Sequence, residues 1–335
     1  MNVLLTGGAG YIGSHMAVAL AQAGHRPVVL DNFCNAKPSV MGRLAALCGE
    51  SLPLVQADVR DTAAVVRAIT EHRIEAVVHF AALKAVGESV AKPMLYFDNN
   101  IGGLLSMVRA MQSTGCRQMV FSSSAVVYGD PARVPISEDD PVGYTNAYAQ
   151  TKLVGEQFLE ALAQSDPSWR VAVLRYFNPV GAHPSGQIGE DPSGIPNNLV
   201  PYIAQVAVGR RERLQVYGSD YATPDGTGVR DYIHIQDLVA GHLASLRVLG
   251  AQGSHLVNLG TGRGYSVMEV IDAYARASGR LIPYELAPRR PGDVATVFTD
   301  PTRAQALLGW QAQFGLDDMC RSSWHWQQQN PNGYP

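Results

Sequence analysis

Three glycines spaced three residues apart constrain the fold of this chain more than any other feature. They follow a short apolar segment at the start of the sequence. Residues 2–6 read Asn-Val-Leu-Leu-Thr, a run typical of a buried strand, and Gly7-Gly8-Ala9-Gly10-Tyr11-Ile12-Gly13 follows directly. Residues 14–23 then show helical apolar spacing and end at Gly24. Strand, glycine turn and helix in this order suit the pyrophosphate of a dinucleotide, because the turn admits the phosphates and the helix N-terminus offers free N–H groups.

A second apolar segment, residues 27–30, ends at Asp31, roughly 20 residues after the glycines. A carboxylate at this position accepts hydrogen bonds from the hydroxyls of the adenine ribose and would repel a ribose phosphate. Because residues 32–35 (Asn, Phe, Cys, Asn) contain no arginine, the sequence favours NAD over NADP. The structural alternative is that Asp31 only caps a turn.

Tyr148 and Lys152 lie four residues apart in Tyr-Ala-Gln-Thr-Lys, so on a helix their side chains share one face. A tyrosine that acts as a general base needs its pKa lowered from ~10 by about 3 units. One positive charge ~4 Å away supplies about that much at an effective dielectric constant of ~20. This spacing also arises by chance on solvated helices, and it is the dinucleotide unit upstream that favours an acid–base pair.

Strands and helices alternate through the first half of the chain. We expect strands at residues 54–55, 76–80, 119–121 and 171–174, and helices at 61–71, 96–114 and 148–163. This pattern predicts an α/β fold with a Rossmann-type doubly wound parallel sheet. A ligand then lies beyond the carboxyl ends of the strands, where the sequence places Asp31, Asp58, Phe80, Ser122 and Tyr176.

The second half of the chain has a different texture. Residues 179–201 and 217–228 are rich in Gly, Pro and Asn, as functional loops often are, and shorter helices are expected around Leu238, Val267 and Leu316. We therefore predict an NAD-binding Rossmann domain over residues 1–178. A smaller C-terminal α/β substrate-binding lobe follows over 179–335, with residues around 230–260 returning to the first domain.

The composition excludes several classes of protein. With 335 residues, 46% of them hydrophobic, about two domains and a large core are expected. A net charge of −3 lacks the basic footprint of nucleic-acid binding, and no run approaches the ~20 apolar residues of a membrane span. The four cysteines are scattered and the histidines show no metal-ligand spacing, so we expect a cytoplasmic protein with reduced thiols, no signal peptide and no metal site.

Three serines, Ser122 to Ser124, follow the strand expected at residues 119–121. Together with the glycine turn, Asp31 and the Tyr148/Lys152 pair, this serine run resembles the extended short-chain dehydrogenase/reductase superfamily. Longer motifs narrow the resemblance to the UDP-glucose (UDP-galactose) 4-epimerases. They span the whole chain and lie at residues 80–89, 121–130, 175–183, 194–199, 225–234 and 324–326. The tyrosine motif departs from the frequent Tyr-Gly-Lys-Ser-Lys of the family, but the tyrosine and the lysine are both kept.

This resemblance implies reversible epimerisation at carbon 4 of UDP-glucose and UDP-galactose, through a transient 4-keto sugar and bound NADH. It implies that Tyr148 takes the proton of the sugar hydroxyl and that Ser124 hydrogen-bonds the reacting oxygen. It also implies that Lys152 binds the nicotinamide ribose and lowers the pKa of Tyr148. A homodimer is implied as well, through the helices near Leu104 and Leu153.

The binding residues that the resemblance implies fall into two sets. Those for NAD are Gly7, Gly10, Tyr11, Ile12, Asp31, Asn32, Asn35, Asp58, Val59, Phe80, Ala81, Lys84, Asn99, Ser122, Tyr148, Lys152, Tyr176 and Phe177. Those for the UDP-sugar are Ser124, Asn178, Asn198, Leu199, Tyr217, Arg230, Arg290, Asp293 and Val297. Guanidinium forks suit a pyrophosphate, although Arg230 and Arg290 could each be in a surface ion pair with Asp231 or Asp293, and Tyr217 could be a small core anchor.

Three other functions share some of these features. A nucleotide-sugar 4,6-dehydratase needs an acidic pair directly before Val-Tyr-Gly, where this chain has Ala125 and Val126. Neither residue can move a proton, which counts against dehydration. An NAD-dependent nucleotide-sugar reductase and a non-catalytic NAD-sensing module are the remaining alternatives.

Substrate breadth in the resembling family depends on one position after Arg-Arg-x-Gly-Asp, where a tyrosine excludes N-acetylated sugars and a small residue admits them. Ungapped alignment places Val297 there. We therefore expect activity on UDP-GlcNAc and UDP-GalNAc as well. Because adjacent strand residues point to opposite faces, an error of one residue would instead put Phe298 in the pocket and close it.

Overall fold

The computed structural model describes residues 1–290 and 292–335. By its internal contacts the chain divides into two compact units. Unit 1 comprises Met1–Asp130, Pro141–Arg175 and Val239–Val257, and unit 2 comprises Pro131–Asp140, Tyr176–Leu238 and Asn258–Pro335. The predicted domain boundary at residue 178 stays a prediction. So does the predicted return of residues around 230–260 to the first domain.

Unit 1 is built on a seven-stranded sheet with the order β10-β6-β5-β4-β1-β2-β3. Its strands are β1 (Asn2–Thr6), β2 (Arg26–Asp31), β3 (Leu54–Gln56), β4 (Ala76–His79), β5 (Gln118–Ser122), β6 (Arg170–Tyr176) and β10 (His255–Leu259). Strands β1 to β6 pair in parallel, and the central ones are buried apolar runs, as a sheet covered on both faces requires. The strand order reverses between β1 and β4, which confirms the predicted doubly wound α/β fold.

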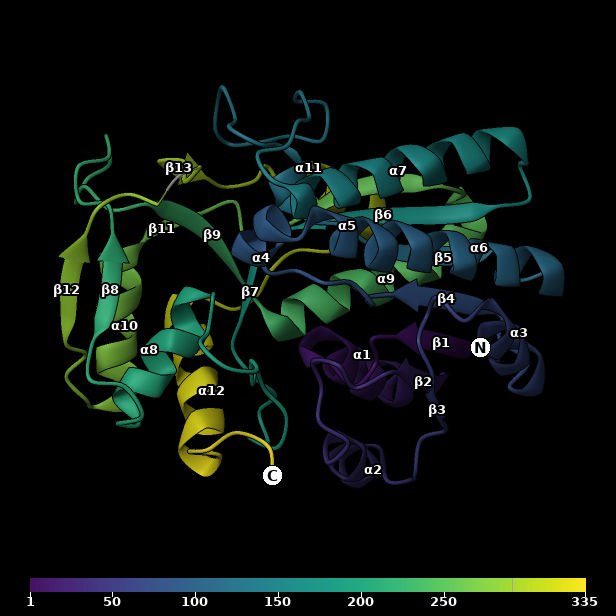
Figure 1. Cartoon of the computed structure of the whole chain (residues 1–335), viewed down its shortest axis with the longest axis horizontal. Helices are drawn as coiled ribbons and strands as arrows, with labels where there is room; N and C mark the ends of the chain where they lie inside the picture. Colours follow the sequence, from purple (N-terminus) through teal and green to yellow (C-terminus); the bar gives the residue numbers. More distant parts are fainter. Residues whose placement is uncertain (291) are drawn as a thin grey trace. The chain divides into compact units, whose positions relative to one another are not determined.

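Helices accompany this sheet (Figure 1). They are α1 (Tyr11–Gln22), α2 (Val40–Cys48), α3 (Thr62–Glu71), α4 (Val86–Ala91), α5 (Pro93–Tyr96), η1 (Phe97–Gly102), α6 (Gly103–Thr114), η2 (Ala125–Val127), α7 (Ala147–Ser165) and most of α9 (Ile235–Gln252). Gly155 lets α7 approach α6 and β5 closely, because a Cβ there would lie 3.0 Å from the Phe121 side chain and 3.2 Å from that of Leu104.

The single helix expected over residues 96–114 differs in the structure. Residues Phe97–Gly102 form a wide π turn ahead of α6. In this turn the buried Asn100 amide accepts the N–H of Leu83 at 2.8 Å and donates to the Thr151 hydroxyl at 3.0 Å. The wider turn thus places a polar side chain between the loop after β4 and helix α7, a tertiary role that helical periodicity does not encode.

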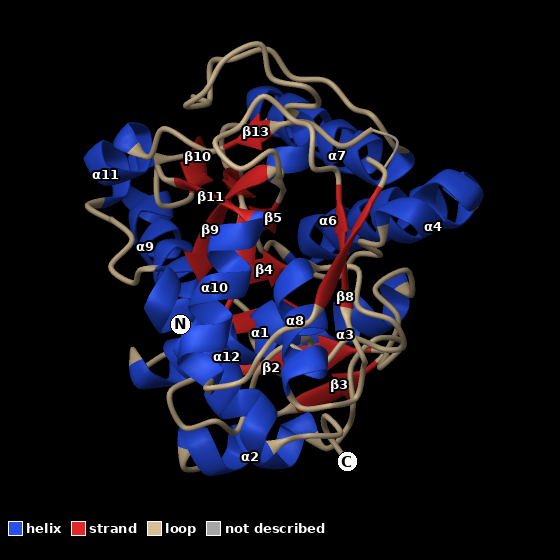
Figure 2. Ribbon diagram, turned by 90° about the vertical axis from the view of Figure 1, so that its left-hand side faces the viewer, coloured by secondary structure: helices blue, strands red, loops and turns tan. Residues whose placement is uncertain are grey.

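Unit 2 is centred on β9 (Val229–His234), which pairs in parallel with β7 (Asn178–Val180) and β13 (Thr296–Val297) and antiparallel with β11 (Gly264–Ser266). A separate parallel pair joins β8 (Leu214–Tyr217) and β12 (Tyr284–Ala287). The helices are α8 (Leu199–Ala207), α10 (Val267–Ser278), α11 (Thr302–Leu308) and α12 (Leu316–Gln329). Helices α10 and α12 lie side by side (Figure 2) around an apolar core that includes Tyr274 and Met319.

Across the described residues, the helices are too short or too polar for any of them to span a bilayer.

Candidate active site

The glycine turn follows β1, donates the Gly7 N–H to Leu30 of β2 at 2.8 Å and lies against the backbone just after β4. Gly7 has a positive φ of 66°, and a Cβ there would lie 3.0 Å from the backbone nitrogen of Ala81. A Cβ at Gly13 would overlap the carbonyl oxygen of Gly7 and lie 2.7 Å from the Cα of Gly8. No side chain of the described chain caps α1 at Gly10, so its N-terminus presents backbone to an anion. Tyr11 and Ile12 are the first two residues of that helix.

Asp31, the last residue of β2, connects this turn to the loop that follows. Its Oδ2 accepts the N–H of Ala9 at 3.0 Å, and its Oδ1 accepts the N–H of Phe33 at 2.8 Å. Burial raises the pKa of Asp31, and the two backbone hydrogen bonds oppose that rise. Since a carboxylate offers about four lone-pair sites, capacity remains for ribose hydroxyls.

A second carboxylate, Asp58, lies close by after β3. The Asn32 amide donates to it at 3.1 Å, and hydrogen bonds from Arg60 are the main cause that lowers the pKa of Asp58 to about 2. Val59 is buried and Asn35 is exposed in the loop after β2. Phe80, Ala81 and Lys84 follow β4, and the Asn99 amide donates to Asn100 at 3.0 Å.

Tyr148 and Lys152 are both buried in the first two turns of α7, where 7% and 4% of their surfaces are exposed. Asn146 fixes where the helix begins, because its side chain accepts the N–H of Ala149 at 2.9 Å. The Lys152 ammonium donates to the carbonyl oxygen of Ser122 at 2.6 Å and lies 5.0 Å from the centre of the Phe121 ring. Burial lowers the pKa of Lys152 to about 8, and the charge of Glu156 opposes this.

The three serines after β5 have different surroundings. The Ser122 hydroxyl is buried and has no hydrogen-bond partner in the described part of the chain. The Ser123 hydroxyl donates to the carboxylate of Glu156. Ser124 caps the short helix η2 by accepting the N–H of Val126 at 3.4 Å, and it keeps 9% of its surface exposed. The structure therefore brings the serine run against the helix face that carries Lys152.

Three buried polar residues near this point were not singled out from the sequence. They are His79, Glu156 and Arg175. His79 is hydrogen-bonded to Thr6 at 2.8 Å and stacks on Phe121, and burial with the nearby Lys152 charge lowers its pKa to about 3. Glu156 lies one turn after Lys152, so the four-residue spacing of Tyr148 and Lys152 also predicts that Glu156 shares their helix face. His79 and Arg175 lie in buried strands, where no such local spacing indicates a site residue.

Unit 2 gathers four of the predicted substrate residues. Asp293 lies between two arginines, 3.9 Å from Arg230 and 3.1 Å from Arg290. The Arg290 guanidinium in turn lies 4.7 Å from the centre of the Tyr217 ring at the end of β8. Partly exposed pairs of this kind add little stability, so they leave the cations available for another anion.

Asp231 is not the surface partner of Arg230 that one alternative suggested. It is fully buried, and its carboxylate accepts hydrogen bonds from Thr261 at 2.9 and 2.7 Å, from Gly262 at 3.1 Å and from Thr299 at 3.2 Å. Burial is the main influence on its pKa, which is raised. Since adjacent residues of β9 project to opposite faces, Arg230 and Asp231 serve different surfaces.

Val297 pairs with Arg230 in the parallel register of β13 and β9. Paired residues of neighbouring strands project to the same face, so Val297 shares a face with Arg230. Phe298, one residue on, has its ring 3.3 Å from the Cβ position of Gly264 on β11.

Other predicted residues lie elsewhere in unit 2. Asn178 begins β7, and Tyr176 ends β6. Asn198 donates to Glu190 at 3.0 Å and precedes Leu199, the first residue of α8. Phe177 follows it and donates its N–H to Leu259 at 3.1 Å.

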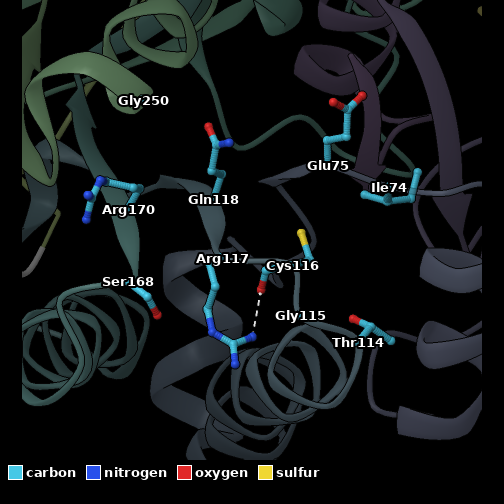
Figure 3. A pocket seen from close by; sticks show the side chains of 10 residues that line it. All are labelled: Ile74, Glu75, Thr114, Gly115, Cys116, Arg117, Gln118, Ser168, Arg170 and Gly250. Carbon is cyan, nitrogen blue, oxygen red and sulfur yellow. Dashed lines mark hydrogen bonds between the residues drawn. The ribbon is translucent and has the colours of Figure 1, made fainter.

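A surface groove lies at the opposite edge of the unit 1 sheet, where β4, β5 and β6 begin (Figure 3). Its lining includes Glu75, Cys116, Arg117 and Arg170. Arg117 donates to the carbonyl oxygens of Met111 and Cys116 at 2.9 and 3.2 Å, so it caps the end of α6. None of the residues predicted to bind NAD or substrate lines this groove. In residues 1–290 and 292–335, no three potential metal-ligating side chains gather at one point.

Comparison with known proteins agrees with this geometry. Residues 4–323 match the family model described as GDP-mannose 4,6 dehydratase. The UDP-glucose 4-epimerase of Bacillus subtilis (strain 168) is 55% identical over 335 residues, covering 100% of this chain and 99% of that one. A crystal structure of UDP-glucose 4-epimerase from Bifidobacterium longum in complex with NAD+ and UDP is similar with a TM-score of 0.97 and 50% identity, covering 100% of both chains. The UDP-Glc/GlcNAc 4-epimerase of Campylobacter jejuni is similar with a TM-score of 0.85 and 35% identity, covering 98% of this chain and 99% of that one.

The doubly wound sheet, its glycine turn and the serine, tyrosine and lysine at its carboxyl edge define an extended short-chain dehydrogenase/reductase. About half of all positions are identical to curated 4-epimerases along the full length of the chain. The chain belongs to the UDP-glucose 4-epimerase family.

Proposed function

We propose that this protein is an NAD-dependent isomerase that interconverts UDP-glucose and UDP-galactose, with Tyr148 as the base. The observation that carries the proposal is the buried Lys152, one helical turn from Tyr148 and 2.6 Å from the carbonyl of Ser122. A buried cation beside a tyrosine favours the phenolate, which is the form that removes a proton.

The unit 1 residues fit NAD. Gly7 and Gly13 leave no room for a side chain, so backbone lines the turn where a pyrophosphate would lie, and Asp31 retains acceptor capacity for the adenine ribose. The buried Ser122 hydroxyl, which lacks a partner among the described residues, is a further group that a ligand could engage. NAD supplies the oxidation and re-reduction of carbon 4 when bound. We propose as its binding residues those predicted from the sequence, from Gly7 to Phe177.

The reaction then depends on proton control by three side chains. Tyr148 accepts the proton of the hydroxyl on carbon 4 and returns it when the sugar is reduced on its opposite face. Lys152, with a pKa near 8, is mostly charged at about pH 7 and stabilises the phenolate. We propose that Ser124 holds the reacting oxygen by a hydrogen bond, since it is the most accessible member of the serine run.

Unit 2 is proposed to bind the UDP moiety. Arg230 and Arg290, grouped around Asp293, supply two cations for the pyrophosphate, and the Tyr217 ring under Arg290 suits the uracil. Asn178, Asn198 and Leu199 complete the proposed set. Val297 shares the face of Arg230, which supports its role as the gate for N-acetylated sugars rather than Phe298.

The residues of the site fit the dehydratase activity named in the family model less well than they fit epimerisation. Dehydration needs an acid and a base in addition to Tyr148, and the positions expected to supply them are Ala125 and Val126 in η2. These side chains cannot exchange protons, so the site supports epimerisation rather than dehydration.

We also propose a homodimer and a cytoplasmic location. Leu104 and Leu153 are buried within the chain itself, but α4 and α5, which contact the helix α7 that carries Leu153, expose Val90 and Met94, of which 65% and 82% are accessible. This apolar surface supports association of two copies, which light scattering can test. The four free cysteines suit a reducing compartment.

The proposed function is tested by incubating the purified protein with UDP-galactose and no added NAD. UDP-glucose should form, and Tyr148→Phe should keep the fold and bound NAD while turnover falls by at least about 10²-fold. Near wild-type turnover in that variant would refute the role of Tyr148. No conversion by the wild type would refute the proposed function and favour an NAD-sensing module.

A further inference from the structure

Unit 1 contains a buried ion pair that the proposed roles leave unused. The Arg175 guanidinium donates to Glu156 three times, through Nη2 at 2.6 Å and through Nε at 3.1 Å to each carboxylate oxygen. Only 6% of either side chain is exposed. Burying two charges is costly, so such a pair is weak evidence for stability and calls for another explanation.

The pair is connected to the chain on both sides of Ser124. Before it, the Ser123 hydroxyl donates to the Glu156 carboxylate, and the Ser123 N–H donates to Leu174 at 2.9 Å. After it, Tyr128 accepts a hydrogen bond from Arg175 at 3.0 Å, and its ring lies 4.9 Å from the guanidinium carbon. The segment that carries Ser124 is therefore held at both ends by one ion pair.

The same pair is connected to helix α7. Tyr148, Lys152 and Glu156 follow one another at intervals of four residues, so they lie on one face of the helix. We propose that Glu156 and Arg175 are positioning residues of the reaction, which hold Ser124 at a fixed place beside Tyr148 and supply a negative charge one turn from Lys152. This inference rests on the proposed function and adds two residues to it.

The electrostatic part concerns the charge of Lys152, whose pKa the Glu156 carboxylate raises against the effect of burial. From β5 the Lys152 ammonium contacts the Phe121 ring and the Ser122 carbonyl, neither of which titrates. The titratable or charged groups around it are Tyr148 and Glu156 on its own helix, His79 on β4 and, beyond Glu156, Arg175 on β6.

Glu156→Gln tests the charge, because the amide oxygen can still accept from Ser123. We expect the high-pH limb of the kcat profile for UDP-galactose, where Lys152 loses its proton, to move about one pH unit to lower pH. Should Arg175, left buried without the Glu156 charge, prevent folding, the double variant Glu156→Gln/Arg175→Met removes both charges. It should move the limb in the same direction by a smaller amount. An unmoved limb in the variant that folds would overturn the electrostatic part.

Ser123→Ala tests the positioning, because it removes one hydrogen bond and leaves both charges in place. We expect kcat to fall about tenfold or more with the high-pH limb unmoved and with NAD content and melting temperature near those of the wild type. The matched control is Ser165→Ala. It removes an exposed serine hydrogen bond at the end of α7, the helix that carries Glu156, and should leave kcat unchanged. Wild-type kcat in Ser123→Ala would overturn the positioning role, whereas an inactive wild type would count against the proposed function instead.

Discussion

Replacing Lys152 by methionine should make the nucleotide-free protein more stable near neutral pH while it abolishes most of the activity. Burial depresses the pKa of Lys152 from 10.5 to about 8. That depression corresponds to about 3 kcal/mol of destabilisation at pH values below 8, where the lysine is charged in both the folded and the unfolded chain. Methionine removes this cost but leaves the carbonyl of Ser122 without its donor, which loses about 1 kcal/mol. The net gain is about 2 kcal/mol at pH values below 8.

The gain should depend on pH in a defined direction. Between about 8 and 10.5 the folded wild type binds fewer protons than the unfolded chain, so its stability rises with pH. The advantage of Lys152→Met should therefore shrink across this window and become a deficit of about 1 kcal/mol at its upper end, where only the lost hydrogen bond to Ser122 remains. For a chain of 335 residues the unfolding entropy is about 0.7 kcal/mol/K, so the melting temperatures of the two proteins should differ by about 3 °C below pH 8. The difference should vanish between about pH 8 and 10.5. A variant that melts below the wild type at neutral pH, or a difference that does not change with pH, would show that the buried charge of Lys152 does not destabilise the fold.

Two further predictions concern the ligands. Denatured wild type should release NAD and not NADP, and Gly13→Ala should purify with little nucleotide, because its Cβ would overlap the carbonyl oxygen of Gly7; NADP in the wild type, or full NAD content in the variant, would contradict this. The wild type should epimerise UDP-GlcNAc. Val297→Tyr should lose that activity but keep its activity on UDP-galactose, since forcing an acetamido group against the added ring costs about 1–3 kcal/mol or more. If the tyrosine variant accepts both sugars equally, Val297 is not the gate.

Local patterns were sufficient for much of unit 1. The strand at Asn2–Thr6 was predicted with its observed bounds, and the helix expected over 148–163 spans Ala147–Ser165. Each is set by apolar spacing or by a cap such as Asn146, which lie within a few residues of the element.

What the sequence did not indicate depends on partners far away along the chain. The π turn at Phe97–Gly102 places Asn100 against Thr151, and the carboxylate of Asp231 is satisfied by Thr261 and Thr299. Nothing in the local pattern distinguishes a buried, multiply hydrogen-bonded aspartate from a surface one. The roles of individual site residues stay predictions until they are measured.

In the proposed reaction carbon 4 is oxidised and then reduced again within one protein, with its hydrogen retained throughout. The most direct measurement uses UDP-galactose that carries deuterium at carbon 4, incubated with the purified protein in ordinary water. We predict UDP-glucose that keeps the deuterium at carbon 4, because that hydrogen passes to the bound cofactor and back while only the hydroxyl proton is transferred to Tyr148. Deuterium lost to the solvent would show that the hydrogen leaves as a proton, and would contradict hydride transfer to a bound cofactor.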